Sequence, residues 1–294
     1  MAVRTLTIPV RPSRTRWLAA RRLLHNRLSV LGLVLVGLIV VAGIGAPYLA
    51  LHDPAAQTLS DRRALPSSRY LLGADEFGRD ILSRILFGSR LALLVGVGSV
   101  AIGMTLGMLV GGGAAITGGW PDDVFMRSMD ILLAFPYLML ALVVVTVLGP
   151  GPVNTTIAVG LWAVPAFARM TRGAVLTVLD QEYVEAARAV GASGVRIAFT
   201  HILPNGLPPV LVLATLYMGY AILLESALSF LGLGVQPPTP SWGLMISTGR
   251  EYLFEAPHVS TFPGLAITLA VLGFNLVGDG LRDALDPKAA ALSR

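Results

Sequence analysis

The residues that decide the fold read DQEYVEAARAVGASGVRIAFTHILP, from Asp180 to Pro204, and they separate two apolar runs of membrane-spanning length. Asp180 is placed to cap a short helix that runs to about Val190. Glu182 and Glu185 fall in the first turns of that helix, where the helix dipole favours negative charge. The interval is therefore expected to begin with a capped polar helix.

A glycine and a serine divide the same interval into two helices. Gly191 has no β-carbon, so it can take the left-handed conformation that ends a helix. Ser193 can start a second helix, which should end before Pro204. Because helices of about ten residues are marginal alone in water, we expect this helix-turn-helix elbow to lean on its own membrane helices or on another protein. The small side chains of Ala186 and Ala187 suit a short helix that lies in a partner's groove.

The spacing of these residues resembles the EAA loop of the permease subunits of bacterial ATP-binding-cassette importers. The matching residues are Glu185-Ala186-Ala187, then Gly191, then Ile202-Leu203-Pro204. One departure is His201, which stands where the general pattern has isoleucine, as in the dipeptide and oligopeptide branch. Two further segments resemble that branch, LGADEFGRD at 72–80 and SFLGLGVQPPTPSWG at 229–243. The chain thus looks like the second, C-type permease of a peptide or nickel importer.

This resemblance implies partners and a division of labour. A homologous second permease would complete the translocation path, two ATPase subunits would drive it, and an extracytoplasmic binding protein would deliver a di- or oligopeptide. ATP and magnesium would be held by the ATPase subunits, so no cofactor is expected in this chain. The residues expected to couple the path to the ATPases are Glu182, Glu185, Ala186, Ala187, Gly191, Leu203 and Pro204.

The composition is that of a membrane protein. Apolar residues make up 54% of the chain and charged residues 13%, which is about half the charged share of soluble domains. Cysteine is absent, which excludes disulfides, zinc-thiolate sites and cysteine nucleophiles. Seven arginines fall in the first 27 residues and no acidic residue precedes Asp53. This distribution favours a cytoplasmic N-terminus over nucleic-acid binding.

The apolar pattern predicts an all-α fold with six transmembrane helices and both termini in the cytoplasm. The predicted spans are 28–50, 91–117, 126–148, 155–175, 208–231 and 262–281. Residues 1–27 would form a cytoplasmic basic segment, 51–90 an extracytoplasmic loop, 91–281 a five-helix core with the coupling loop 180–204, and 282–294 a cytoplasmic tail. Six arginines between residues 62 and 90 oppose this orientation, and five acidic residues offset them. We expect the bacterial inner membrane as the location.

The residues of common catalytic and metal sites are missing or scattered. Lys288 is the single lysine and follows no glycine-rich turn, so the chain has no phosphate-binding loop of its own. The four histidines show no metal-ligand spacing, and no G-x-S-x-G nucleophile elbow is visible. The chain is therefore not expected to be an enzyme.

Polar groups within the spans are the candidates for the translocation path. Glu225 is the one acidic residue well inside a span, so it should face a cavity or hold a helix interface through Ser226 or Ser229. We add Asn154 and Trp162 as candidates for the path.

Other spans carry signals of helix packing and bending. Ser99, Gly103, Gly107 and Gly111 recur every four residues, which places small side chains where another helix can approach closely. Pro136 and Pro165 interrupt two spans, where bends are expected.

The segment from Asp75 to Arg84 mixes charged residues with apolar ones at helical spacing. This pattern predicts an amphipathic helix along the outer membrane surface, which could receive the binding protein.

A rival for the whole chain is a secondary carrier or channel driven by an ion gradient, but such proteins usually show more midplane charges and an internal repeat.

Overall fold

The computed structural model describes residues 21–285. The expected basic segment up to residue 20 and the tail from residue 286 onward, with Lys288, lie outside the described residues. The described chain is helical and has no strand, only an isolated bridge between Ala74 and Asp80. Its α-helices are α2 (Arg27–Leu49), α3 (Ile81–Thr117), α4 (Gly119–Ala134), α5 (Tyr137–Leu148), α6 (Pro152–Leu179), α7 (Glu182–Ala189), α8 (Gly194–Ile197), α9 (Leu203–Phe230), α10 (Trp242–Gly249) and α11 (His258–Leu285).

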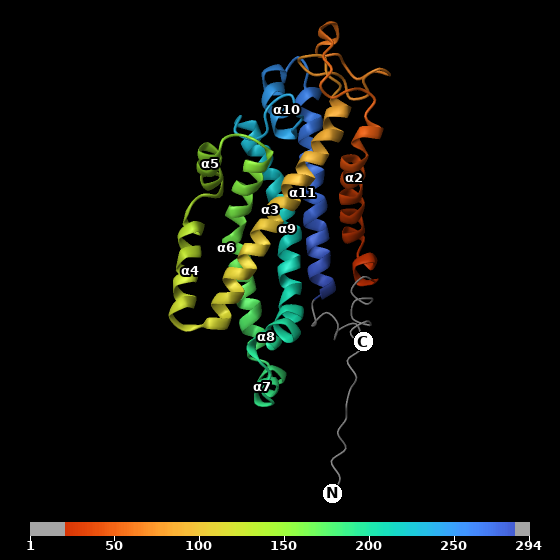
Figure 1. Ribbon diagram of the computed structural model, residues 1–294. Coiled ribbons are helices and arrows are strands. Elements are labelled where there is room, and N and C mark those ends of the chain that lie inside the picture. Colours follow the sequence, from red (N-terminus) through yellow and green to blue (C-terminus); the bar gives the residue numbers. More distant parts are fainter. Residues whose placement is uncertain (1–20, 286–294) are drawn as a thin grey trace.

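The long helices lie side by side and run between two ends of a bundle (Figure 1). The short helices α7 and α8 stand at one end, together with the start of α2 and the end of α11. The other end carries α10 and the long connection between α2 and α3. We call residues 51–80 and 231–257 at that end the cap.

Four helical stretches of the described chain are long and apolar enough to cross a membrane. They are Arg27–Leu49, Ile81–Thr117, Gly194–Phe230 and His258–Leu285. A fifth is possible if α4 and α5 form one span, although they meet at an angle of 92°. The break lies at Phe135 and Pro136, so the bend expected at Pro136 is confirmed, whereas Pro165 lies inside the continuous helix α6. The less apolar α6 is not among the candidates, so length and composition alone identify four or five spans, and the six expected spans stay a prediction.

The stripe of small residues on α3 packs against α6, as its spacing predicted. A β-carbon added at Gly111 would lie 1.9 Å from the carbonyl oxygen of Ala168, and one at Gly107 would lie 2.4 Å from the β-carbon of Phe167. The hydroxyl of Ser99 donates a 3.0 Å hydrogen bond to the backbone carbonyl of Thr156. Any larger side chain along this stripe would therefore push the two backbones apart.

The expected amphipathic helix over residues 75–84 is wrong. Residues 75–80 form turns that end at Asp80, whose side chain caps α3 by accepting from the Ser83 amide at 2.9 Å. Gly78 has φ +74°, and a β-carbon there would lie 1.9 Å from the carbonyl oxygen of Thr58. This close backbone approach replaces a helix. α3 consequently begins at Ile81, ten residues before the expected start of the second span at residue 91.

Buried ion pairs hold this turn in the cap. Arg79 pairs with Asp75 at 2.6 Å and with Glu76 at 3.0 Å, and Arg84 lies 3.4 Å from Asp75. All four side chains are at most 8% exposed. The charges that suggested a solvated helix face therefore neutralise one another inside the cap instead.

Candidate functional site

The elbow between α6 and α9 forms as a helix, a glycine turn and a second helical segment. Its first helix, α7, begins at Glu182 with Gln181 as the capping residue. The expected cap by Asp180 is wrong, because Asp180 ends α6 and leaves α7 without a side-chain cap. Glu182 and Glu185 lie exposed in the first turn, which places two negative charges at the positive end of the helix dipole.

Gly191 ends α7 as its residue type predicted. Its φ of +85° is left-handed, its amide donates to the carbonyl of Arg188 at 2.9 Å, and the amide of Ala192 donates to the carbonyl of Ala187 at 3.0 Å. Ser193 then caps α8 by accepting from the Arg196 amide at 3.4 Å. The two helices of the elbow are thus joined by a defined turn.

The second helical segment does not end before Pro204, contrary to expectation. α8 continues through a π-helical turn at Ala198–Ile202 directly into α9. Pro204 stands in the first turn of α9, where it does not interrupt the helix. The elbow is therefore continuous with α9, so a displacement of one is transmitted to the other.

Three buried side chains attach the elbow to the bundle. Val184, Ile197 and Ile202 are 0%, 4% and 6% exposed. They pack in one cluster with Val175 and Val178, near the end of α6, and with Ala115 of α3. Because protein interiors are close-packed, this cluster makes the elbow a rigid extension of the bundle.

The opposite face of the elbow is bare and apolar. Val190 and Val195 are 85% and 70% exposed. Ala186, which follows Glu185, is exposed, while Ala187 is half-buried in the anchoring cluster. Leu203 and Pro204 are exposed at the start of α9. Contiguous exposed apolar groups rimmed by charge are typical of protein-interaction surfaces.

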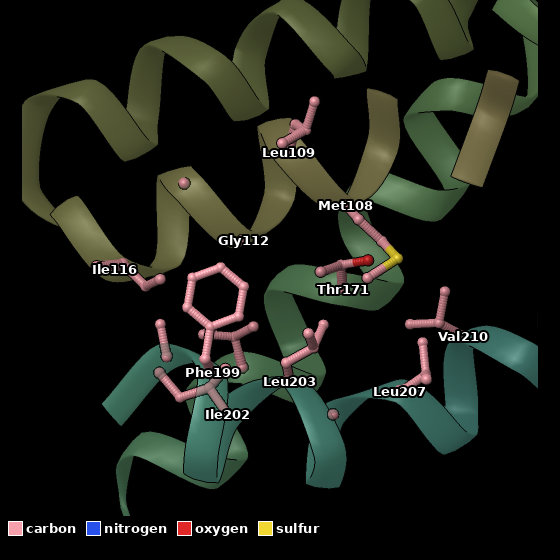
Figure 2. A pocket seen from close by; sticks show the side chains of 14 residues that line it. Met108, Leu109, Gly112, Ile116, Thr171, Phe199, Ile202, Leu203, Leu207 and Val210 are labelled. Atoms are coloured by element: carbon pink, nitrogen blue, oxygen red, sulfur yellow. The ribbon is translucent and has the colours of Figure 1, made fainter. Parts of the chain in front are cut away.

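An apolar pocket of about 300 Å³ opens between the elbow and the bundle (Figure 2). Met108 and Ile116 of α3 face Phe199 and Leu203 across it (Figure 2). Thr171 of α6 contributes the one hydroxyl of the lining, and its oxygen is buried without a hydrogen-bond partner. The gap shows that the π-helical turn is less tightly packed on α3 than the anchoring cluster is on α6.

Glu225 is buried, and both oxygens of its carboxyl group accept hydrogen bonds. It is 1% exposed and accepts hydrogen bonds from Ser229 at 2.7 Å, Ser241 at 2.9 Å and Ser226 at 3.3 Å. Ser226 and Ser229 belong to α9, and Ser241 precedes α10. Glu225 therefore holds α9 to the cap, which is the interface role that the sequence left open for it.

Asn154 and Trp162 occupy two different environments on α6. The Asn154 amide donates to the carbonyls of Leu148 at 2.8 Å and Gly149 at 3.1 Å, so it closes the turn between α5 and α6. Trp162 is half-buried and its ring stacks on Tyr217 of α9 at 5.2 Å. Only Trp162 among the three expected path residues lies in an aromatic cluster open to the surface.

Two arginines of α6 are polar groups that the sequence interpretation missed. Arg172 makes two hydrogen bonds of 2.6 Å to Asp122 of α4, and Arg169 pairs with Asp130 of the same helix. Arginines within an otherwise apolar interval were the available signal, but their partners lie 39 and 50 residues away. In the described range 21–285, no group of three His, Asp or Glu side chains could hold a metal ion.

Comparison with known proteins identifies the family. The model of the family described as "Binding-protein-dependent transport system inner membrane component" matches residues 103–291. The chain belongs to this family. A second model, "N-terminal TM domain of oligopeptide transport permease C", matches residues 15–66 of the permease. The resemblance to the permease subunits of binding-protein-dependent importers is thus confirmed.

Curated relatives match the permease over most of its length. A di/tripeptide transport system permease protein of Pseudomonas aeruginosa is 47% identical over 270 residues, 90% of this chain and 89% of the relative. A glutathione transport system permease protein of Pectobacterium atrosepticum is 44% identical over 289 residues, 96% and 95% of the two chains. An inward-facing structure of the MetNI methionine ABC transporter matches with a TM-score of 0.57 and 19% identity, covering 69% of this chain and 97% of that chain. That structure supports the fold alone.

Proposed function

We propose that this permease forms, together with a homologous second permease, the path by which di- and oligopeptides enter a bacterial cell. Two ATPase subunits drive the cycle and hold ATP and magnesium, and an extracytoplasmic binding protein delivers the peptide. The substrate class is supported by the relatives, which are named for dipeptide, di/tripeptide and glutathione transport. The observation that carries the coupling part of the proposal is the elbow, with one face anchored and the other bare.

The elbow is the lever by which the ATPases move the path. An ATPase groove covers the exposed Val190 and Val195 and meets the negative charges of Glu182 and Glu185. Because the elbow is packed on α6 and continuous with α9, closure of the ATPase pair tilts both helices as one body. Access then alternates between the two sides by rigid-body motion.

This mechanism requires the elbow to face the cytoplasm. We infer six crossings, made by α2, α3, the bent pair α4 and α5, α6, α9 and α11, with both ends of the chain on the elbow side. The shared end of α2, α7 and α11 in Figure 1 supports this arrangement. The cap then faces outward, toward the binding protein.

We keep Trp162 in the proposed path and place Glu225 and Asn154 outside it.

Cysteine labelling tests the orientation, since the natural chain contains no cysteine. Val195→Cys in the elbow and Leu65→Cys in the cap are matched reporters, because the native side chains are 70% and 68% exposed. In intact spheroplasts a membrane-impermeant maleimide should label residue 65 and spare residue 195, which should react only after lysis. Labelling of residue 195 from outside would show that no cytoplasmic ATPase can reach the elbow.

Transport by the complete importer tests the substrate and the energy source. Proteoliposomes with both permeases, both ATPases and the binding protein should take up a labelled tripeptide only with internal ATP. A protonophore should leave uptake unchanged. Uptake by this permease alone, driven by an ion gradient, would instead support the rival carrier.

A further inference from the structure

A groove of about 690 Å³ runs along the bundle between α4, α6 and α9. Its lining includes Leu133 at the end of α4, Arg169 and Gly173 of α6, and Pro209 and Leu213 of α9. It is separate from the apolar pocket beside the elbow, which opens toward α3. The groove follows the exposed side of α6, where residues recur at helical spacing.

An aromatic cluster continues the groove toward the cap. Trp162 precedes the groove residue Ala166 by one turn of α6, and Tyr217 follows Leu213 by one turn of α9. The Trp162 ring lies 5.2 Å from Tyr217 and 6.4 Å from Tyr220. Tyr137, at the bend between α4 and α5, lies 6.0 Å from Trp162 and closes the cluster from the other side.

The cluster presents rings and polar tips to whatever enters the groove. Tyr137 and Tyr220 are each 54% exposed. Aromatic rings of this kind supply a rigid contact area at a small entropic cost, and their hydroxyl groups add hydrogen bonds.

Charges in the part of the groove that lies farther from the cap argue against a lipid-facing surface. Arg169 and Asp130 form an ion pair and their side chains are 53% and 54% exposed. Arg169 lies ten residues before the end of α6 at Leu179, which is about 15 Å along the helix axis. Half-exposed charges at that depth face a water-filled cavity or a charged ligand, because hydrocarbon does not solvate them.

We propose that this groove is the peptide-contact surface of the translocation path. Arg169 pairs with the terminal carboxylate of a short peptide in transit, and the Trp162 cluster contacts the side chains of that peptide. Asp130 orients Arg169 while the groove is empty. The proposal rests on the proposed function, since it assigns the place at which a transported peptide is held.

The distance between the two ends of the proposed site fits a peptide of about three residues. Trp162 and Arg169 are seven positions apart on α6, which corresponds to a rise of about 10.5 Å along the helix axis. An extended tripeptide spans about 10 Å, at roughly 3.3–3.6 Å per residue. A tripeptide with its carboxylate on Arg169 therefore reaches the rings of Trp162 and Tyr217.

Photo-crosslinking in the complete importer tests this surface directly. A p-benzoylphenylalanine introduced at Tyr220 should attach to a radiolabelled tripeptide during ATP-driven uptake. The same group at Val41, which is 61% exposed on α2, should not. In importer preparations that transport peptide, adducts of residue 220 with lipid or the second permease alone would overturn the proposal. Loss of peptide uptake by the wild-type importer would instead overturn the proposed function.

Charge selection tests the role of Arg169. With the same binding protein at saturation, wild type should transport a free-carboxylate tripeptide faster than its C-terminal amide. Arg169→Gln should reduce the ratio of the two uptake rates, free carboxylate over amide, by about tenfold. This change corresponds to the loss of one charged hydrogen bond. Arg169→Lys, which keeps the charge, should retain most of the ratio. An unchanged ratio in Arg169→Gln would overturn the assignment of the carboxylate.

Discussion

The hydroxyl of Ser241 donates a 2.9 Å hydrogen bond to Oε1 of Glu225, and the two residues are 16 positions apart in the chain. Glu225 belongs to α9 and Ser241 immediately precedes α10, so this bond joins a long helix of the bundle to the cap. Glu225 is only 1% exposed, so each serine contact with its carboxyl group replaces a lost hydration bond. The pair therefore explains how a carboxyl group is accommodated deep in the bundle.

Removal of this carboxyl group should loosen the cap. Glu225→Ala leaves the hydroxyls of Ser229 and Ser241 without their acceptor, at a cost of about 1–3 kcal/mol for each buried group left unpaired. The apparent thermal midpoint of the assembled complex should fall in Glu225→Ala. It should fall less in Glu225→Gln, which keeps an acceptor. Glu251→Ala removes an exposed acid and serves as the control. Equal midpoints for Glu225→Ala and this control would contradict the interface role.

A single methyl group should separate α3 from α6. Gly111→Ala places a β-carbon 1.9 Å from the Ala168 carbonyl oxygen, so the helices must move apart. We expect a loss of about 1–3 kcal/mol, as for other overpacked sites. Gly113→Ala, two residues along the same helix, meets open space and should be neutral. Thermal unfolding of both variants measures the difference, and similar stabilities would show that α3 and α6 are not closely packed in the membrane.

A β-branched residue at the elbow turn should uncouple ATP hydrolysis from uptake. Gly191→Val forces a side chain into φ +85°, a strain on the order of 1–3 kcal/mol, while leaving the membrane helices intact. The variant should insert normally, but move less peptide per ATP in reconstituted vesicles. Gly194→Val is the matched control, because Gly194 has an ordinary φ and open space around it. A normal coupling ratio in Gly191→Val would refute the lever.

The buried acid cluster in the cap should respond to pH. Burial, and secondly the negative charge of Asp75, raise the pKa of Glu76 above its usual value of about 4.3. Since the folded-state pKa is the higher one, the contribution of Glu76 to stability is greatest below its unfolded pKa. This contribution is lost as pH rises through the raised value.

Glu76→Gln tests this dependence, because it keeps the shape of the side chain and does not titrate. The variant should gain stability relative to wild type as pH rises from 4 to 8, measured as the difference in thermal midpoint. Glu251→Gln, on an exposed acid, should show no such trend. A difference between Glu76→Gln and wild type that is independent of pH would show that Glu76 is not protonated preferentially in the fold.

Local features of this protein could be predicted from its sequence. Gly191 ends α7 because only a residue without a β-carbon enters the left-handed region freely. The four-residue spacing from Ser99 to Gly111 indicated a close helix contact, and Pro136 indicated the bend between α4 and α5. The prediction of an amphipathic helix at residues 75–84 failed because it rested on the helical spacing of the charges alone. Buried ion pairs and a backbone contact with Thr58 stabilise a turn there instead.

The sequence by itself determined the apolar helices, the elbow with its glycine turn and the family to which the chain belongs. These features depend on composition and on neighbours within a few residues, where helix periodicity and capping operate. Only the tertiary structure decided that Glu225 binds Ser241, that Arg169 pairs with Asp130, and that the rings of Trp162 and Tyr217 stack on each other. Those contacts join distant segments, and their geometry arises from how the helices pack against each other.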